Sequence, residues 1–145
     1  MKMLILKFFF VLIVFTSTSY ANDIFISASE LPQEAQTFLS VHFANNPVHL
    51  VEKDKNLFSS DYEVSFINGT EIEFDSKGIW KKIDGNGNKI PDSVISPIIL
   101  NYVSTNYYQQ HIDKIEKERW GYDIKLNNRL ELEFDLNGKF LKIDR

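Results

Sequence analysis

Residues 71–75 read Glu-Ile-Glu-Phe-Asp, and residues 131–135 read Glu-Leu-Glu-Phe-Asp, 60 positions later (131 minus 71). The same offset aligns residues 62–66 with residues 122–126 without a gap. Two unrelated amphipathic strands would share an alternation, but not the same acids, the same phenylalanine and the same turn glycine (Gly78) in register. Because self-similarity at one fixed period is the signal of a repeated unit, we expect two copies of one unit.

The end of each copy is predicted to be a β-hairpin. The aspartate and glycine of residues 75–78 and 135–138 suit a type I turn whose glycine has a positive φ. This turn pairs Phe74 with Trp80, and an odd-length loop through residues 68–69 keeps the preceding strand in phase. The apolar face then carries Tyr62, Val64, Phe66, Ile72, Phe74 and Trp80, with Leu132, Phe134 and Phe140 in the second copy. The opposite face carries Glu71, Glu73 and Lys81, or Glu131, Glu133 and Leu141.

A helix is predicted ahead of the strands in each copy. Leu31-Pro32 and Ile90-Pro91 open the two helical stretches, with proline in the first turn, where its missing N–H costs nothing. Pro97 should kink the second helix or delay its start. The expected apolar helix faces are Ala35, Phe38, Leu39, Val41 and Phe43, and Val94, Ile95, Ile98, Ile99 and Tyr102.

The predicted fold class is α+β. Val48 and Val51, like Ile112 and Ile115, mark the first strand of each unit. Each unit is therefore a helix followed by a four-stranded antiparallel sheet. The units are placed at residues 22–85 and 86–145.

Residues 1–21 have the pattern of a signal peptide. Lys2 and Lys7 give a basic start, residues 8–15 are an apolar run, and the residues around Ala21 suit cleavage. The alternative, a membrane anchor, needs about 20 apolar residues, and this run is shorter. We therefore expect a periplasmic or secreted product cleaved near Ala21, without integral membrane association.

The charge and the absence of cysteine exclude several classes of protein. Removing the two lysines of the signal changes the formal charge from −4 to −6. An acidic protein is poorly suited to nucleic acid, since phosphate contacts need a basic surface, and equally to anionic membranes. Without cysteine there are no disulfides, so an ordinary apolar core must hold the fold together.

The repeated pattern resembles the PepSY-like domains of exported bacterial proteins, whose fold is similar to β-lactamase inhibitor protein. The residues that carry this resemblance are Leu31-Pro32 and Ile90-Pro91, the pairs Val48/Val51 and Ile112/Ile115, Tyr62 to Val64 and Tyr122 to Ile124, Asn68 to Asp75, and Gly78, Trp80, Gly138 and Phe140. The resemblance covers nearly the whole chain after residue 21, and the chain departs from it at Pro97 and at the short hairpin of Trp120. The resemblance implies tandem units whose sheets abut in one curved surface with the helices on one side. It also implies a protein-binding or inhibitory role and no catalytic residues.

No motif for catalysis or for a cofactor is present. There is no cysteine nucleophile and no G-x-S-x-G sequence around a serine, so we predict that the protein is not an enzyme. His42, His49 and His111 are scattered, whereas zinc needs ligands at close spacing. Residues 84–88 begin like a calcium loop, but Ile95 stands where the bidentate glutamate belongs. We therefore expect no metal site and no cofactor, and read this segment as a turn between the repeats.

Paired acids and loop aromatics are the candidate binding residues. Glu71 and Glu73, like Glu131 and Glu133, lie two apart on a strand and share a face. They indicate either a solvated face paired with lysines such as Lys81 and Lys82, or an acidic recognition surface. Phe58 and Trp120 lie in connections, where aromatic side chains anchor partners; for Trp120 a lid over the core is an equal alternative.

The sequence thus predicts a non-enzymatic binding module that takes an exported protein or peptide on its open sheet face, through Glu71, Glu73, Lys81, Glu131, Glu133, Phe58 and Trp120. Inhibition of an exported enzyme is the sharpest form of this hypothesis. The alternative is a periplasmic sensor domain for a small molecule or an ion. We expect a monomer.

Overall fold

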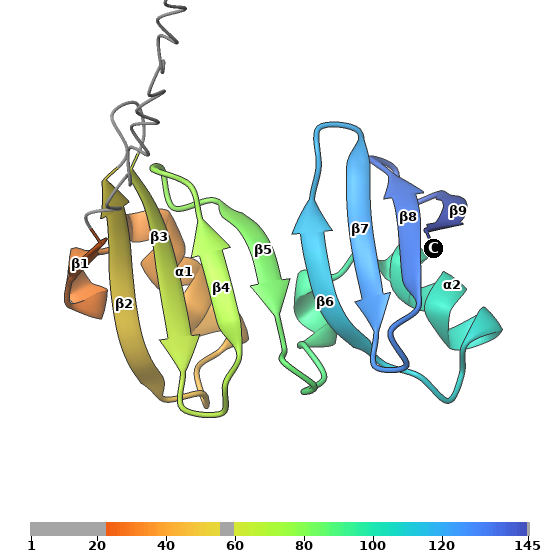
Figure 1. The fold of residues 1–145 in the computed structure, drawn as a ribbon, viewed down its shortest axis with the longest axis horizontal. Helices are drawn as coiled ribbons and strands as arrows, with labels where there is room; N and C mark the ends of the chain where they lie inside the picture. The colour runs from red at the N-terminus through yellow and green to blue at the C-terminus, as the bar shows by residue number, and fades with distance from the viewer. Residues whose placement is uncertain (1–22, 56–59, 145) are drawn as a thin grey trace, which may run out of the picture.

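The computed structural model describes residues 23–55 and 60–144 (Figure 1). They form two α-helices and one nine-stranded sheet in which all neighbouring strands run antiparallel, in the order β1 to β9. The elements are β1 (Asp23–Phe25), α1 (Gln33–His42), β2 (Val48–Lys55), β3 (Ser60–Phe66), β4 (Glu71–Phe74), β5 (Trp80–Asp84), α2 (Pro97–Asn106), β6 (Ile112–Lys117), β7 (Gly121–Leu126), β8 (Glu131–Asp135) and β9 (Phe140–Asp144). Short 3₁₀ turns, η1 (Ala28–Glu30) and η2 (Asp92–Val94), precede the helices.

Strand β1 was not predicted. It pairs antiparallel with β2, with Ile24 opposite Lys53, and extends the sheet by one strand at the end formed by the first half of the chain. It has three residues, which are too few to show a period. At the middle of the sheet β5 pairs directly with β6, which makes one continuous sheet of the two halves.

The predicted hairpin registers are confirmed. Phe74 lies opposite Trp80, with a bulge before it, and Phe134 lies opposite Phe140 in the same way. The loop between β3 and β4 has odd length, because the N–H of Phe66 donates to the carbonyl of Thr70 across three residues. Tyr62, Val64 and Phe66 are consequently buried on the same side as Ile72 and Phe74.

The two helices begin differently. Pro32 is the N-cap of α1, whereas Pro91 caps only η2, and α2 starts later with Pro97 at its first turn and the Ser96 hydroxyl accepting from the N–H of Ile98. The predicted delay at Pro97 is thus correct. Two residues predicted for the apolar helix faces are wrong because they are exposed: Val41 is 67% exposed and Ile98 is 58% exposed. They lie at the margin of the apolar stripe, on the solvent side of helices that touch the sheet along one narrow face. The prediction also placed Val94 and Ile95 on the second helix, but both precede α2, in η2 and at its C-cap.

Both helices pack on one face of the sheet and leave the other face open (Figure 1). Phe38 of α1 meets Phe74 edge-on, with ring centroids 5.8 Å apart, and Tyr102 of α2 meets Phe134 at 5.4 Å in the same geometry. Phe74 and Phe134 are fully buried and lie at the centre of the core. An edge-to-face aromatic pair therefore contributes to the packing of each helix on the sheet.

Gly78 sets the close approach of α1 to the hairpin between β4 and β5. Its φ is +83°, and a Cβ atom there would lie 2.8 Å from the backbone nitrogen of Ala35 and 2.8 Å from the Cβ of Pro32. Both the backbone conformation and the space favour glycine. The turn predicted from Asp75 and Gly78 therefore also serves as the contact point for the helix.

Candidate binding surface

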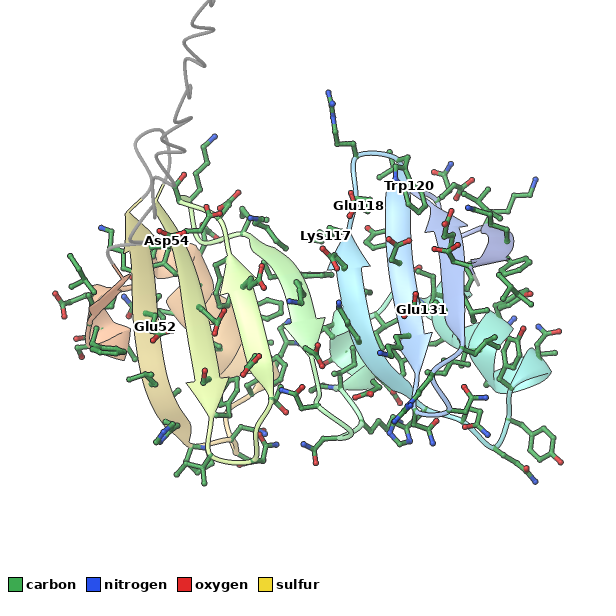
Figure 2. The ribbon with its side chains drawn as sticks, viewed as in Figure 1. Glu52, Asp54, Lys117, Glu118, Trp120 and Glu131 are labelled. Atoms are coloured by element: carbon green, nitrogen blue, oxygen red, sulfur yellow. The ribbon has the colours of Figure 1, made fainter. Side chains whose placement is uncertain are left out.

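The open face of the sheet consists of the residues that alternate with the core. Along β4, for example, Ile72 and Phe74 are buried while Glu71 and Glu73 are partly exposed. The side chains of this face project toward the viewer in Figure 2, with the helices behind. A strand that has one face on the core and one in water produces this alternation.

Carboxylates dominate the open face. The strand positions that alternate with the core carry the acids Glu52, Asp54, Asp61, Glu63, Glu71, Glu73, Asp84, Glu116, Asp123, Glu131, Glu133, Asp135 and Asp144. The cations at such positions are Lys82, Lys114, Lys125 and Lys142, with Lys81 at the β5 bulge. The face is therefore negative, and complementary to a cationic partner.

Acids lie directly opposite one another at several places in the ladder, where Glu52 faces Glu63 and Glu116 faces Asp123, for example. Glu63 of β3 is the register partner of Glu73 of β4, and Asp123 of β7 is the register partner of Glu133 of β8. Opposite residues on one face lie about 5 Å apart, and like charges there destabilise the sheet. Both halves of the sheet carry this unfavourable arrangement at equivalent positions.

Asp123 lies between Glu116 of β6 and Glu133 of β8, at the centre of an acidic cluster in the second half of the sheet. Its Oδ1 atom is buried and accepts no hydrogen bond from any described residue. Burial, followed by repulsion from Glu133, Glu118 and Glu116, raises the pKa of the Asp123 carboxyl from 3.8 to about 6. This group borders a hollow of about 100 Å³ on the open face. A cation entering that hollow would oppose the shift, because its charge favours the ionised carboxylate and offsets the repulsion from the neighbouring acids.

Glu63 takes the equivalent place in the first half. Burial raises the pKa of its carboxyl, and repulsion from Glu71, Glu73 and Glu52 adds to the effect. It borders a hollow of about 210 Å³ whose other lining residues include Glu52, Asp54 and Asp61. The two halves therefore present similar acidic hollows.

Lysines neutralise part of each cluster. The ammonium of Lys82 lies 2.8 Å from Glu73, and that of Lys142 lies 2.9 Å from Glu133. Lys81 instead bridges Asp61 of β3 at 2.8 Å, because the bulge offsets it from Glu73. Partly exposed pairs of this kind contribute little stability, so each cluster keeps a negative surplus.

The other predicted site residues are spread over the surface. Glu71 and Glu131 lie on β4 and β8, which are four strands or roughly 19 Å apart at ordinary strand spacing. Trp120 lies in the tight turn between β6 and β7 (Figure 2). Its side chain is 42% exposed and does not belong to the core cluster. This exposure favours a residue that anchors a partner over a residue that covers the core. Phe58 lies outside the described residues. The structure thus gathers the acids into two clusters rather than one site.

The polar side chains of the loop after β5 are engaged in hydrogen bonds within the chain. No group of three or more His, Cys, Asp or Glu side chains within residues 23–55 and 60–144 is arranged to hold a metal ion. In the loop, Asp84 accepts from the N–H of Asn86, and the amides of Asn86 and Asn88 donate to the carbonyls of Gly69 and Asn68. These bonds attach the loop to the β3–β4 turn and account for its polar residues.

The sequence did not single out Glu63 and Asp123, the most perturbed acids of the surface. The period of 60 aligns them with each other, and alternation places each on the open face. What the sequence does not give is the register that puts Glu73 and Glu133 directly across from them, because register depends on the loop geometry.

Comparison with known proteins identifies the same family that the sequence pattern resembles. The family model described as "Putative beta-lactamase-inhibitor-like, PepSY-like" matches residues 60–142. A solved structure from Bacteroides thetaiotaomicron, described as a "putative calcium-regulated periplasmic protein", is 38% identical, covers 85% of this chain and 97% of its own, and has a TM-score of 0.81.

Two structures from Bacteroides vulgatus are also similar, and each is described as a "putative periplasmic protein". One is 37% identical with a TM-score of 0.79, covering 86% of this chain and 98% of its own. The other, of "unknown function", is 35% identical with a TM-score of 0.78, covering 85% and 99%. No match is found among the curated proteins. No helix in the described part of the chain is long and apolar enough to cross a membrane.

Proposed function

The chain belongs to the β-lactamase-inhibitor-like, PepSY-like family, and from that premise we propose that it is an exported, non-enzymatic module whose open sheet face binds a basic segment of a protein or peptide. One observation carries the proposal. Glu63 faces Glu73, and Asp123 faces Glu133, although like charges across a ladder cost stability. Because this repulsion destabilises both halves of the sheet, a cation bound on the open face would relieve it.

The size of the hollows favours side chains over metabolites. Their volumes are about 100 and 210 Å³, below the roughly 300–1,000 Å³ typical of small-molecule pockets. A lysine or arginine head group is small enough to enter, and its charge would pair with Asp123 or Glu63. An extended basic segment lying across the sheet would reach both clusters, with Trp120 as an anchor at the rim.

Export fits this role. The three similar structures are described as periplasmic proteins, and residues 1–21 have the pattern of a cleaved signal peptide. The partner in this proposal is itself an exported protein or peptide. Inhibition of an exported enzyme is one form that such binding takes.

We further propose that the two halves, residues 22–85 and 86–145, are tandem copies of one helix-plus-four-strand unit. The registers of β4 with β5 and of β8 with β9 coincide at the offset of 60, including the bulge before Phe74 and Phe134. A duplicated unit presents the acidic hollow twice and so doubles the contacts available to one extended partner.

A second candidate is an ion-responsive sensor. The relative described as calcium-regulated favours it, and the partnerless oxygen of Asp123 is a possible ligand. Against it stands the absence of a metal-binding group of three side chains in the described residues. Thermal unfolding with and without millimolar calcium separates the two, because an ion that binds the folded state raises the melting temperature.

The proposal is tested by affinity capture from the native periplasm with the exported protein, followed by kinetics with the captured partner. Because the acids steer a basic partner, association should slow as salt rises. A captured partner whose association rate is independent of salt would overturn the electrostatic part of the proposal.

A further inference from the structure

Strand β9 is built like β5 but ends the sheet. Ile83 lies opposite Ile72 on β4, and Ile143 lies opposite Leu132 on β8 in the same register. On its other side β5 pairs with β6, whereas no strand of the described chain pairs with the outer edge of β9 (Figure 1). Accordingly Ile83 is 0% exposed and Ile143 is 38% exposed.

The junction of β5 with β6 shows what such an edge accepts. Lys82 lies opposite Glu116, Ile83 opposite Ile115, and Asp84 opposite Lys114. A cation therefore meets an anion on each side of an apolar pair. These are the combinations that stabilise an antiparallel ladder.

The free edge of β9 carries the same three residue types, Lys142, Ile143 and Asp144. If two β9 strands pair antiparallel about Ile143, Lys142 of each copy lies opposite Asp144 of the other, and the two Ile143 side chains meet. We propose that two copies of this chain dimerise through β9 in this way and join their nine-stranded sheets. Such an interface is self-complementary, as two-fold symmetry requires.

The charges on this edge support pairing rather than prevent it. Charged side chains usually protect an edge strand, since like charges of two copies repel. On β9 the signs alternate about Ile143, so self-pairing brings opposite charges together. Leu141, which is 48% exposed, replaces Lys81 of the first half and adds apolar surface to the strand. The dimer needs no basic partner, so this inference is independent of the proposed function.

The first test is sedimentation equilibrium of the protein purified from the periplasm, over the micromolar to several-hundred-micromolar range. We expect a monomer–dimer equilibrium. Ile143→Asp, which places two acids at the symmetry axis, should weaken it by at least about tenfold, as loss of a central interface residue does. Ile24→Asp is the matched control, because Ile24 on β1 is also 38% exposed but lies at the opposite edge; the dimer should persist.

The second test exchanges the charges. Lys142→Asp and Asp144→Lys should each be monomeric alone, because like charges then face each other across the axis. An equimolar mixture of the two variants should form a heterodimer, since every opposite pair is again a cation and an anion. This rescue separates edge pairing from a general loss of structure.

A wild-type monomer over the whole concentration range would overturn the proposal and support the monomer expected from the sequence. A dimer that survives Ile143→Asp, or that Ile24→Asp abolishes, would place the interface elsewhere and overturn it equally. Failure of the two charge variants to associate, with each retaining its wild-type circular dichroism spectrum, would contradict the antiparallel register.

Discussion

Asp123 of β7 lies directly across from Glu133 of β8, while the cation nearest to Glu133 is Lys142 on the far side, at 2.9 Å. Lys142 thus neutralises Glu133 from β9, and no lysine or arginine of the described residues forms an ion pair with Asp123. The same arrangement joins Glu63, Glu73 and Lys82 in the first half. Each acidic cluster is therefore only partly neutralised, and the core beneath the sheet holds its strands in place.

Replacing Asp123 with asparagine should stabilise the protein at pH 7 by at most about 1 kcal/mol after allowance for solvent screening. The pKa of this carboxyl rises from 3.8 to about 6 on folding, so the folded state binds the proton more tightly. The contribution of Asp123 to stability therefore improves as the pH falls from above 6 toward 4. Urea denaturation of wild type and variant at pH 7 and pH 4 should show the difference shrinking at the lower pH.

The control for this measurement is Glu34→Gln, which removes an exposed carboxylate from α1. It should change stability by less than about 0.5 kcal/mol. An Asp123→Asn variant that is less stable than wild type at pH 7 would show that the carboxylate has a favourable partner and that the cluster is not strained.

Phe74→Ala and Phe134→Ala should each cost about 3–5 kcal/mol, as removal of a buried aromatic side chain does. Both residues are 0% exposed and each meets a helix aromatic edge-on. Chemical denaturation measures the cost, and Val41→Ala, at a position 67% exposed, should change stability by less than about 0.5 kcal/mol. Losses below about 1 kcal/mol for both phenylalanines would contradict the core assignment.

Gly78→Ala should destabilise the fold by about 1–3 kcal/mol more than Gly69→Ala, because overpacking adds to backbone strain. Both glycines have positive φ, +83° and +89°, so both variants incur the left-handed backbone cost. Only at Gly78 would the new Cβ meet Ala35 and Pro32, whereas nothing lies within 4 Å at Gly69. Equal losses in thermal unfolding would mean that α1 does not rest on the hairpin.

Features that depend on neighbouring residues, such as hairpin register, could be predicted from the sequence. The period of 60 and the Asp–Gly turn give the pairing of Phe74 with Trp80, because hairpin register follows from turn chemistry. The sequence misses β1, which is too short to alternate, and assigns Val41 and Ile98 to the core, because helical spacing alone does not define the width of the buried stripe.

The residues of the candidate binding surface are likewise predicted only in part from the sequence. The repeat in the sequence identifies Glu73 and Glu133 as equivalent acids. That they lie directly opposite Glu63 and Asp123 follows only from the register of β3 with β4 and of β7 with β8. Trp120 is singled out by its position in a short connection, yet its exposure depends on the tight turn that the structure shows. The alternation of apolar and polar residues shows which side chains lie on the open face. The pairing of the strands determines which of these charges lie close enough to repel.

Reversing two open-face charges with Glu71→Lys plus Glu131→Lys should slow association with the captured partner and leave the stability nearly unchanged. Both residues are at least partly exposed, and exposed pairs contribute little to folding. Surface plasmon resonance at low and moderate salt measures the rate. Glu34→Lys, on the opposite side of the sheet, is the control, and an equal effect of both changes would remove the open face from consideration.

Trp120→Ala should act on dissociation instead. As a half-exposed anchor in the β6–β7 turn, Trp120 should contribute about 2 kcal/mol or more to binding, mostly through the off-rate. The same instrument separates the two rates. An unchanged off-rate together with reduced thermal stability would instead identify Trp120 as a lid of the core.

The most direct test of cation binding by the open face is an NMR titration of the Asp123 carboxyl carbon, alone and with a short arginine-rich peptide, at low salt. We expect a pKa of about 6 for the Asp123 carboxyl without peptide and a fall toward the ordinary value of 3.8 when a guanidinium enters the cluster. An acidic peptide of the same length should leave the value unchanged. A pKa that stays near 6 with the arginine peptide bound, or backbone shifts confined to α1 and α2, would contradict the claim that the acidic face receives a basic partner.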